Sequence, residues 1–103
     1  MIAKPTISVD STTLEAFCRA HRIRKLSLFG SVLKGTARPD SDVDLLVEFQ
    51  PEARPSFLDL AGMEQELSDL LGGQRVDLRT PAELSRYFRD EVLRTAAVQY
   101  VAG

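Results

Sequence analysis

The chain has 103 residues, 44% of them hydrophobic and 27% charged, which is the composition of an ordinary globular domain, so we predict a single domain over residues 1–103. Thirteen Lys and Arg against fifteen Asp and Glu give a formal net charge of −2, which disfavours a protein held to nucleic acid by phosphate neutralisation. A single cysteine excludes an internal disulfide and no apolar run reaches the roughly 18 residues of a membrane span, so the sequence predicts a cytoplasmic protein without membrane contact or direct nucleic-acid binding.

The first elements are predicted to be a helix and a strand. Thr12 and Glu15 form a T-x-x-E pattern that is typical of a helical capping box, and apolar residues follow at helical spacing as far as about His21. Cys18 lies on the apolar stripe of this helix and is predicted to be a core residue. His21 stands at the helix end and is predicted to be solvated. Residues 23–29 then form an apolar run that predicts a first strand.

A stretch with unusual composition, GSVLKGTARPDSDVDLLVEF, occupies residues 30–49. It closes on Asp42 and Asp44 at the head of an alternating strand pattern. Alternate residues of a strand project to the same face, so these two carboxylates point the same way and suit a hard divalent cation, which prefers oxygen ligands. The turn at Gly30 and Ser31, if it leads into a helix, offers free backbone N–H groups to a phosphate. The combination predicts metal-assisted nucleotide chemistry.

The second half contains a long helix, a short strand and one or two further helices. Ser56 is a predicted N-cap, and the helix after it ends at the glycines of residues 72–73. Residues 74–79 predict a third strand with Asp77 on its polar face. The T-P-A-E pattern at residues 80–83 is a second capping box, which opens one last helix or two short ones. The final AAVQYVAG is compatible with a strand or with a frayed end.

The predicted order is helix, strand, short helix, strand, long helix, strand and helix. It favours an α/β (α+β) fold with a small mixed β-sheet and helices packed on one face, because each helix has one apolar stripe to bury. The other face of the sheet would carry the polar strand residues, including Asp42, Asp44 and Asp77.

Two motifs carry a family resemblance. G-S-x-x-x-G followed by S-D-x-D-L-x-V, from Gly30 to Val47, resembles the signature of the DNA polymerase β-like nucleotidyltransferase superfamily. A later aspartate on a neighbouring strand completes that signature, and Asp77 in R-V-D-L matches it. The length and layout resemble the minimal nucleotidyltransferases (MNT) that act as antitoxins in HEPN–MNT toxin–antitoxin systems.

The resemblance implies the polymerase β-like nucleotidyltransferase fold and an enzyme that uses ATP with a two-ion Mg²⁺ site. It implies that one carboxylate also accepts the proton of the attacking hydroxyl, and the match assigns this role to Asp77. The metal ligands and catalytic residues would be Asp42, Asp44 and Asp77. The residues that bind the nucleotide and its phosphates would be Gly30, Ser31 and Ser41.

Three functions are compatible with this resemblance. The leading hypothesis is an antitoxin-type protein adenylyltransferase, which transfers AMP from Mg·ATP to a hydroxyl, expected to be that of a tyrosine, on a cognate HEPN toxin and so neutralises its RNase activity. In the second, the antitoxin acts by direct binding and its nucleotide site is minor or regulatory. The third is nucleotidyl transfer to a small molecule, for which the chain is short. The partner, the choice of nucleotide, the number of AMP groups and the oligomeric state stay open.

Overall fold

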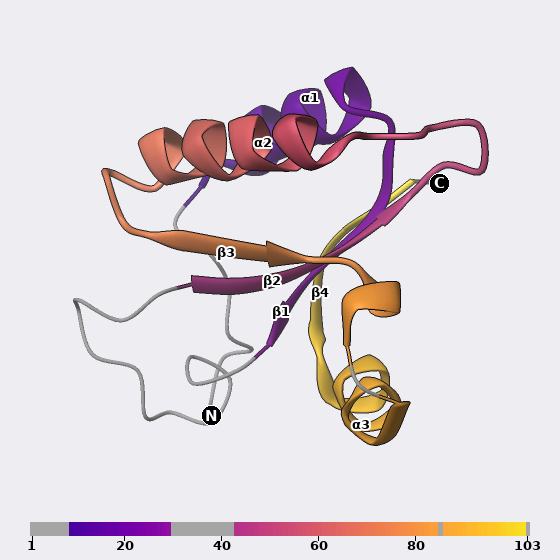
Figure 1. Ribbon diagram of the computed structural model, residues 1–103. Coiled ribbons are helices and arrows are strands. Elements are labelled where there is room, and N and C mark those ends of the chain that lie inside the picture. The colour runs from indigo at the N-terminus through magenta and orange to yellow at the C-terminus, as the bar shows by residue number, and fades with distance from the viewer. Residues whose placement is uncertain (1–8, 30–42, 85, 103) are drawn as a thin grey trace, which may run out of the picture.

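Four strands form one mixed sheet in the order β3-β2-β1-β4, as a computed structural model shows for residues 9–29, 43–84 and 86–102 (Figure 1). Within these ranges the elements are α1 (Ser11–Ala20), β1 (Ile23–Phe29), β2 (Val43–Phe49), α2 (Phe57–Leu70), β3 (Val76–Arg79), the 3₁₀-helix η1 (Pro81–Glu83), α3 (Arg86–Thr95) and β4 (Ala97–Val101). The short helix predicted between the first two strands falls in residues 30–42, outside the described ranges. No helix in the described ranges is long and apolar enough to cross a bilayer.

The central strand, β1, pairs antiparallel with both β2 and β4, whereas β2 and β3 are parallel and are connected through α2. The C-terminal segment is therefore a strand, which resolves the alternative that the sequence left open. The third strand begins at Val76, two residues later than predicted. The register sets Asp44 opposite Phe29 on one side and opposite Asp77 on the other. This pairing fixes the neighbours of the candidate site.

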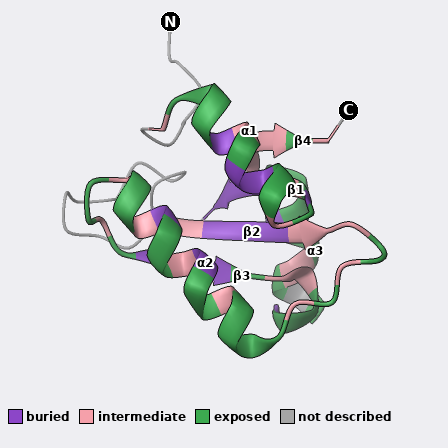
Figure 2. Cartoon of the chain, turned by 90° about the horizontal axis from the view of Figure 1, so that it is seen from above, coloured by how far each residue is buried: buried purple, intermediate pink, exposed green. Residues whose placement is uncertain are grey.

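Helices α1 and α2 lie side by side over one face of the sheet (Figures 1 and 2). Alternate residues of the strands point toward them and are buried with the apolar stripes of both helices. The buried residues of this main core are Leu14, Phe17, Cys18, Ile23, Leu26, Leu28, Val43, Leu45, Val47, Met63, Leu67, Val76 and Leu78. Cys18 is fully buried, and burial raises the pKa of its thiol to about 12, as its predicted core position requires.

A second, smaller apolar cluster lies on the opposite face and consists of Phe29, Leu46, Leu84 and Val92. Val92 belongs to α3, so this helix lies on the side of the sheet away from α1 and α2 (Figure 1). The predicted α+β fold with a small mixed sheet is confirmed, whereas the prediction that the helices pack on one face is wrong, because α3 lies on the other face. The strand pattern did not reveal this placement, because β2 carries the buried residues Leu45 and Leu46 on opposite faces and can receive a helix on either.

The first helix begins two residues earlier than predicted, with its N-cap at residue 10 instead of residue 12. Its N-cap is Asp10, whose carboxylate accepts a hydrogen bond from the Thr13 backbone N–H at 3.3 Å. The predicted capping box at Thr12 is therefore wrong. Asp is at least as good an N-cap as Thr, and the Asp10 carbonyl also accepts the first helical bond, from Leu14 at 2.9 Å.

The two later helix starts follow the sequence prediction. Ser56 and Asp59 form a reciprocal capping box, with the Asp59 N–H donating to Ser56 Oγ at 3.1 Å and the Ser56 N–H donating to Asp59 Oδ2 at 2.8 Å. Thr80 and Glu83 form the second box. It opens η1, and α3 follows as a separate helix, so the version with two short helices is confirmed.

Candidate active site

Asp44 and Asp77 lie directly beside each other on neighbouring parallel strands. Each is the middle residue of a V-D-L tripeptide, and the two tripeptides are in register, Val43 with Val76 and Leu45 with Leu78. The flanking Val and Leu side chains are buried under α1 and α2, so the alternation of the strand directs both aspartates to the opposite face. Adjacent strands are about 4.8 Å apart, which brings the two carboxylates within reach of one shared ligand.

The structure thus brings together two of the predicted site residues. Both aspartates are half-buried, and Asp44 stands beside the buried Phe29 at the end of β1. The other predicted residues lie outside the described ranges, and their roles stay predictions: Gly30, Ser31, Ser41 and Asp42. Residue 30 directly follows the end of β1 and residue 42 directly precedes β2, so both are adjacent in the chain to the strand ends at Phe29 and Val43.

Arg79 engages both carboxylate oxygens of Asp77. Its Nε lies 3.0 Å from Oδ1, and its second terminal nitrogen donates to Oδ2 at 3.3 Å. The remaining terminal nitrogen lies 3.7 Å from Glu83 Oε2, on η1. The hydrogen bond to Asp77, reinforced by the charge of that carboxylate, raises the pKa of the Arg79 guanidinium above its already high value. Asp77 therefore stands within a cluster of alternating charge, Asp77–Arg79–Glu83.

The chemistry of this donor set fits a divalent cation. Asp44 and Asp77 offer carboxylate oxygens from one face, and two adjacent negative charges favour a cation between them. Within the described ranges no group of three or more His, Cys, Asp or Glu side chains could hold a metal ion. Two of the three predicted ligands belong to that part of the chain, and the third is Asp42.

The outer edge of β3 is closed by a side chain from α2. Glu64 accepts a hydrogen bond from the Leu78 backbone N–H at 2.7 Å, so it occupies a position that a further strand would otherwise pair with. Beside it is a cavity of about 190 Å³, whose lining includes Phe57, Glu64, Asp77 and Arg79. One carboxylate of the site is therefore accessible from the side of the sheet.

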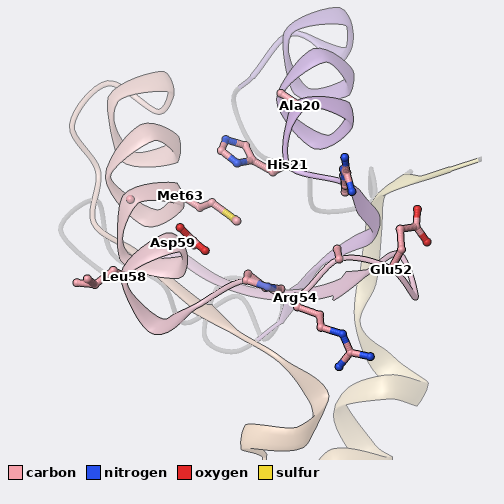
Figure 3. A pocket seen from close by; sticks show the side chains of 11 residues that line it. Ala20, His21, Glu52, Arg54, Leu58, Asp59 and Met63 are labelled. Carbon is pink, nitrogen blue, oxygen red and sulfur yellow. The ribbon is translucent and has the colours of Figure 1, made fainter.

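A second cavity is larger, with a volume of about 550 Å³ (Figure 3). It is formed by the C-terminal end of α1, the loop after β2 and the first turns of α2, with Arg54 and Met63 in its lining. These elements adjoin the start of β1, whereas Asp44 pairs with the last residue of β1. Neither Asp44 nor Asp77, the two predicted catalytic residues in the described ranges, lines this cavity.

His21 lines the larger cavity and is half-buried, so it is less solvated than predicted. Its Nε2 lies 2.6 Å from Glu66 Oε2 on α2, and its ring is tilted against that of Phe17 with centroids 4.6 Å apart. It joins α1 to α2, a structural role for the single histidine of the chain.

Three neighbours of the site were not predicted from the sequence: Arg79, Glu83 and Glu64. The first two could have been found, because Arg79 is two strand positions after Asp77 and therefore on the same face, and Glu83 belongs to the capping box that was recognised. Glu64 carries no local signal, since its contact with β3 arises only when α2 packs against the sheet.

Comparison with known proteins identifies the family of the chain. A nucleotidyltransferase domain model matches residues 11–99. The protein adenylyltransferase MntA of Thermococcus cleftensis is 38% identical, over 79% of this chain and 87% of the relative. A solved minimal nucleotidyltransferase is also 38% identical, with a TM-score of 0.65 over 86% of this chain and 95% of that structure.

Two toxin–antitoxin complexes share the fold at lower identity. One contains AMP-PNP and matches with a TM-score of 0.72 at 20% identity, over 91% of this chain and 75% of that chain. The other is a tri-AMPylated HEPN toxin of Shewanella oneidensis with its MNT antitoxin, which matches with a TM-score of 0.62 at 17% identity, over 89% of this chain and 70% of that chain. Together with the paired aspartates, these findings confirm the predicted family: the chain belongs to the nucleotidyltransferase domain family and is one of its minimal members.

Proposed function

We propose that this protein is an antitoxin that transfers AMP from Mg·ATP to a hydroxyl group of a cognate HEPN-type toxin. The observation that carries the proposal is the in-register pairing of Asp44 with Asp77 on one face of a nucleotidyltransferase sheet. It is supported by a relative that is named a protein adenylyltransferase and by shared-fold antitoxins that were solved with AMP-PNP or with an AMPylated toxin. A tyrosine is the acceptor that we expect.

The reaction makes two bonds and breaks two, because the proton lost by the acceptor becomes bonded to a carboxylate. The acceptor oxygen bonds to the α-phosphorus of ATP, the bond from that phosphorus to the β-phosphate oxygen breaks, and pyrophosphate leaves. The O–H bond of the acceptor also breaks, and we assign its proton to Asp77, the carboxylate on the edge strand that is accessible from the side. When bound, Mg²⁺ supplies positive charge that stabilises the phosphates and activates the acceptor hydroxyl.

The chain's own residues would divide the remaining work. Asp42, Asp44 and Asp77 would hold the metal, because carboxylate oxygens are the ligands that Mg²⁺ prefers. The phosphates would be bound by Gly30, Ser31 and Ser41. Glycine suits the first of these positions because a side chain there would obstruct the approach of the backbone to a phosphate.

The test is the intact mass of the HEPN protein encoded by a neighbouring gene, co-expressed with this chain. With the unaltered chain we expect a gain of one or more AMP units. With Asp44→Asn or Asp77→Asn we expect none, whereas Asp90→Asn, at an exposed position of α3, should modify the toxin normally. Peptide mapping would then show whether the modified residue is a tyrosine.

Neutralisation by binding alone is the second candidate, and one observation favours it. Apolar side chains are exposed on three elements, with Phe57 and Leu58 on α2, Phe88 and Leu93 on α3, and Val98 and Val101 on β4. Such residues are typical of a surface that contacts another protein. If the toxin copurifies with the Asp44→Asn chain, stays unmodified and is still neutralised, binding becomes the function and the AMP-transfer proposal fails.

A further inference from the structure

We infer that Arg79 is a positioning residue that holds Asp77 in place until a divalent cation displaces it. This inference rests on the proposed function, because it concerns the same carboxylate. Arg79 would thus occupy Asp77 while the cation is absent and compete with the cation for it, without being one of the metal ligands.

The ion pair between Arg79 and Asp77 is bidentate. Arg79 Nε and one terminal nitrogen reach the two oxygens of Asp77 at 3.0 and 3.3 Å. Because a planar guanidinium binds a carboxylate through two parallel contacts, it fixes the rotation of that carboxylate as well as its distance. The two residues are two positions apart on one strand, so the contact needs no other element to form.

The Arg79 guanidinium also forms an ion pair with Glu83 on η1. Its remaining terminal nitrogen lies 3.7 Å from Glu83 Oε2. The other oxygen of Glu83 accepts hydrogen bonds from the Thr80 backbone N–H at 3.3 Å and from the Thr80 hydroxyl at 3.1 Å. The capping box that begins η1 therefore also orients the guanidinium toward Asp77. This is a second reason for the position of that box directly after β3.

The pair is exposed enough to be exchanged. The side chain of Arg79 is 48% exposed and that of Asp77 is 34% exposed. Exposed ion pairs change an equilibrium constant by at most about fivefold, so a divalent cation can compete for the same carboxylate. A fully buried pair would resist this exchange, because breaking it leaves an uncompensated charge in the interior.

The guanidinium supplies positive charge beside the two carboxylates while the divalent cation is absent. Asp44 is the register neighbour of Asp77, and two adjacent carboxylates repel each other when no cation is present. Arg79 places a single positive charge at one of them. A divalent cation brings twice that charge and can contact both.

The experiment measures Mn²⁺ binding to the full chain by electron paramagnetic resonance, with AMP-PNP present. Arg79→Gln removes the competitor for Asp77, so we expect the variant to bind Mn²⁺ about two- to fivefold more tightly than the unaltered chain. Arg79→Lys keeps the charge but cannot span both oxygens, so its affinity should lie between the two. Arg86→Gln, at an exposed position of α3, is the matched control and should change nothing.

A double variant distinguishes the contact between Arg79 and Asp77 from a general effect of charge on Mn²⁺ binding. In a chain that already carries Asp77→Asn, adding Arg79→Gln should no longer tighten Mn²⁺ binding, because the carboxylate that Arg79 holds is gone. Circular dichroism confirms that each variant is folded.

Three outcomes overturn the inference. Unchanged or weaker Mn²⁺ binding by Arg79→Gln would remove its basis. Equal binding by Arg79→Lys and the unaltered chain would show that only charge matters, and persistence of the effect with Asp77→Asn would assign it to another ligand. In each case the unaltered chain still binds Mn²⁺ and the proposed function stands. If the unaltered chain binds no Mn²⁺ with AMP-PNP present, the proposed function fails together with this inference.

Discussion

The two faces of the sheet carry different kinds of residue. The face under α1 and α2 is a continuous apolar core, whereas the opposite face combines a small apolar cluster with Asp44 and Asp77. The same V-D-L tripeptides serve both, since their Val and Leu residues enter the main core and their Asp residues the candidate site. Stability and the proposed chemistry would therefore depend on alternate residues of the same strands, and substitutions should separate the two.

The largest expected effect is a loss of stability from a substitution in the main core, on the sheet face under α1 and α2. Leu67 is fully buried in the main core, so Leu67→Ala should lower the free energy of unfolding by about 2–5 kcal/mol, from lost apolar burial and the cavity that remains. Urea denaturation measures this. Leu58→Ala on the same helix is the control, because that side chain is 83% exposed and its loss should change stability by less than about 0.5 kcal/mol. Equal effects at the two sites would contradict the assignment of this core.

The next effect concerns activity more than stability. Asp44→Asn keeps the size of the side chain and removes its charge, so AMP transfer should fall by at least about a hundredfold. Because this residue is outside both apolar clusters, the free energy of unfolding should change by less than it does in Leu67→Ala. Parallel rate and urea measurements test both statements. A variant that keeps its activity would place the chemistry elsewhere.

A truncation in the small apolar cluster should lower the free energy of unfolding less than one in the main core. Val92→Ala removes two buried methyl groups, and at about 0.8 kcal/mol for each group the expected loss of stability is about 1.5 kcal/mol. Thermal denaturation of this variant beside Leu67→Ala gives the comparison directly. A loss as large as that of Leu67→Ala would mean that α3 belongs to one shared core.

The smallest effect is a dependence on pH at the start of α2. Hydrogen bonds from Ser56, first from its backbone and then from its side chain, lower the pKa of Asp59 below the ordinary 3.8. A lowered pKa in the folded state means that the stabilisation is present above 3.8 and is lost as the pH falls through the lowered value. The difference in melting temperature between the unaltered chain and Asp59→Asn should therefore be largest at neutral pH and disappear in strong acid. A difference that grows in acid would contradict this sign.

Local signals predicted the elements well. The apolar run gave β1 its observed bounds, and the two capping boxes at Ser56 and Thr80 were recognised because every contact they need lies within four residues. The candidate site was predicted in composition by its aspartates. What the sequence could not supply were the distant contacts: the register that sets Asp44 beside Asp77, the side of the sheet that receives α3, and the contact of Glu64 with β3. Each depends on how elements separated in the chain pack together.

The order of the strands has a consequence for the growing chain on the ribosome. β1 lies in the middle of the sheet, and one of its edges is completed only by β4, at residues 97–101. During synthesis β1 and β2 can pair early, while the other edge of β1 keeps unpaired backbone groups until residues 97–101 have been made. A chain that ends before Ala97 would therefore expose one edge of an inner strand, which makes it a substrate for chaperones and proteases.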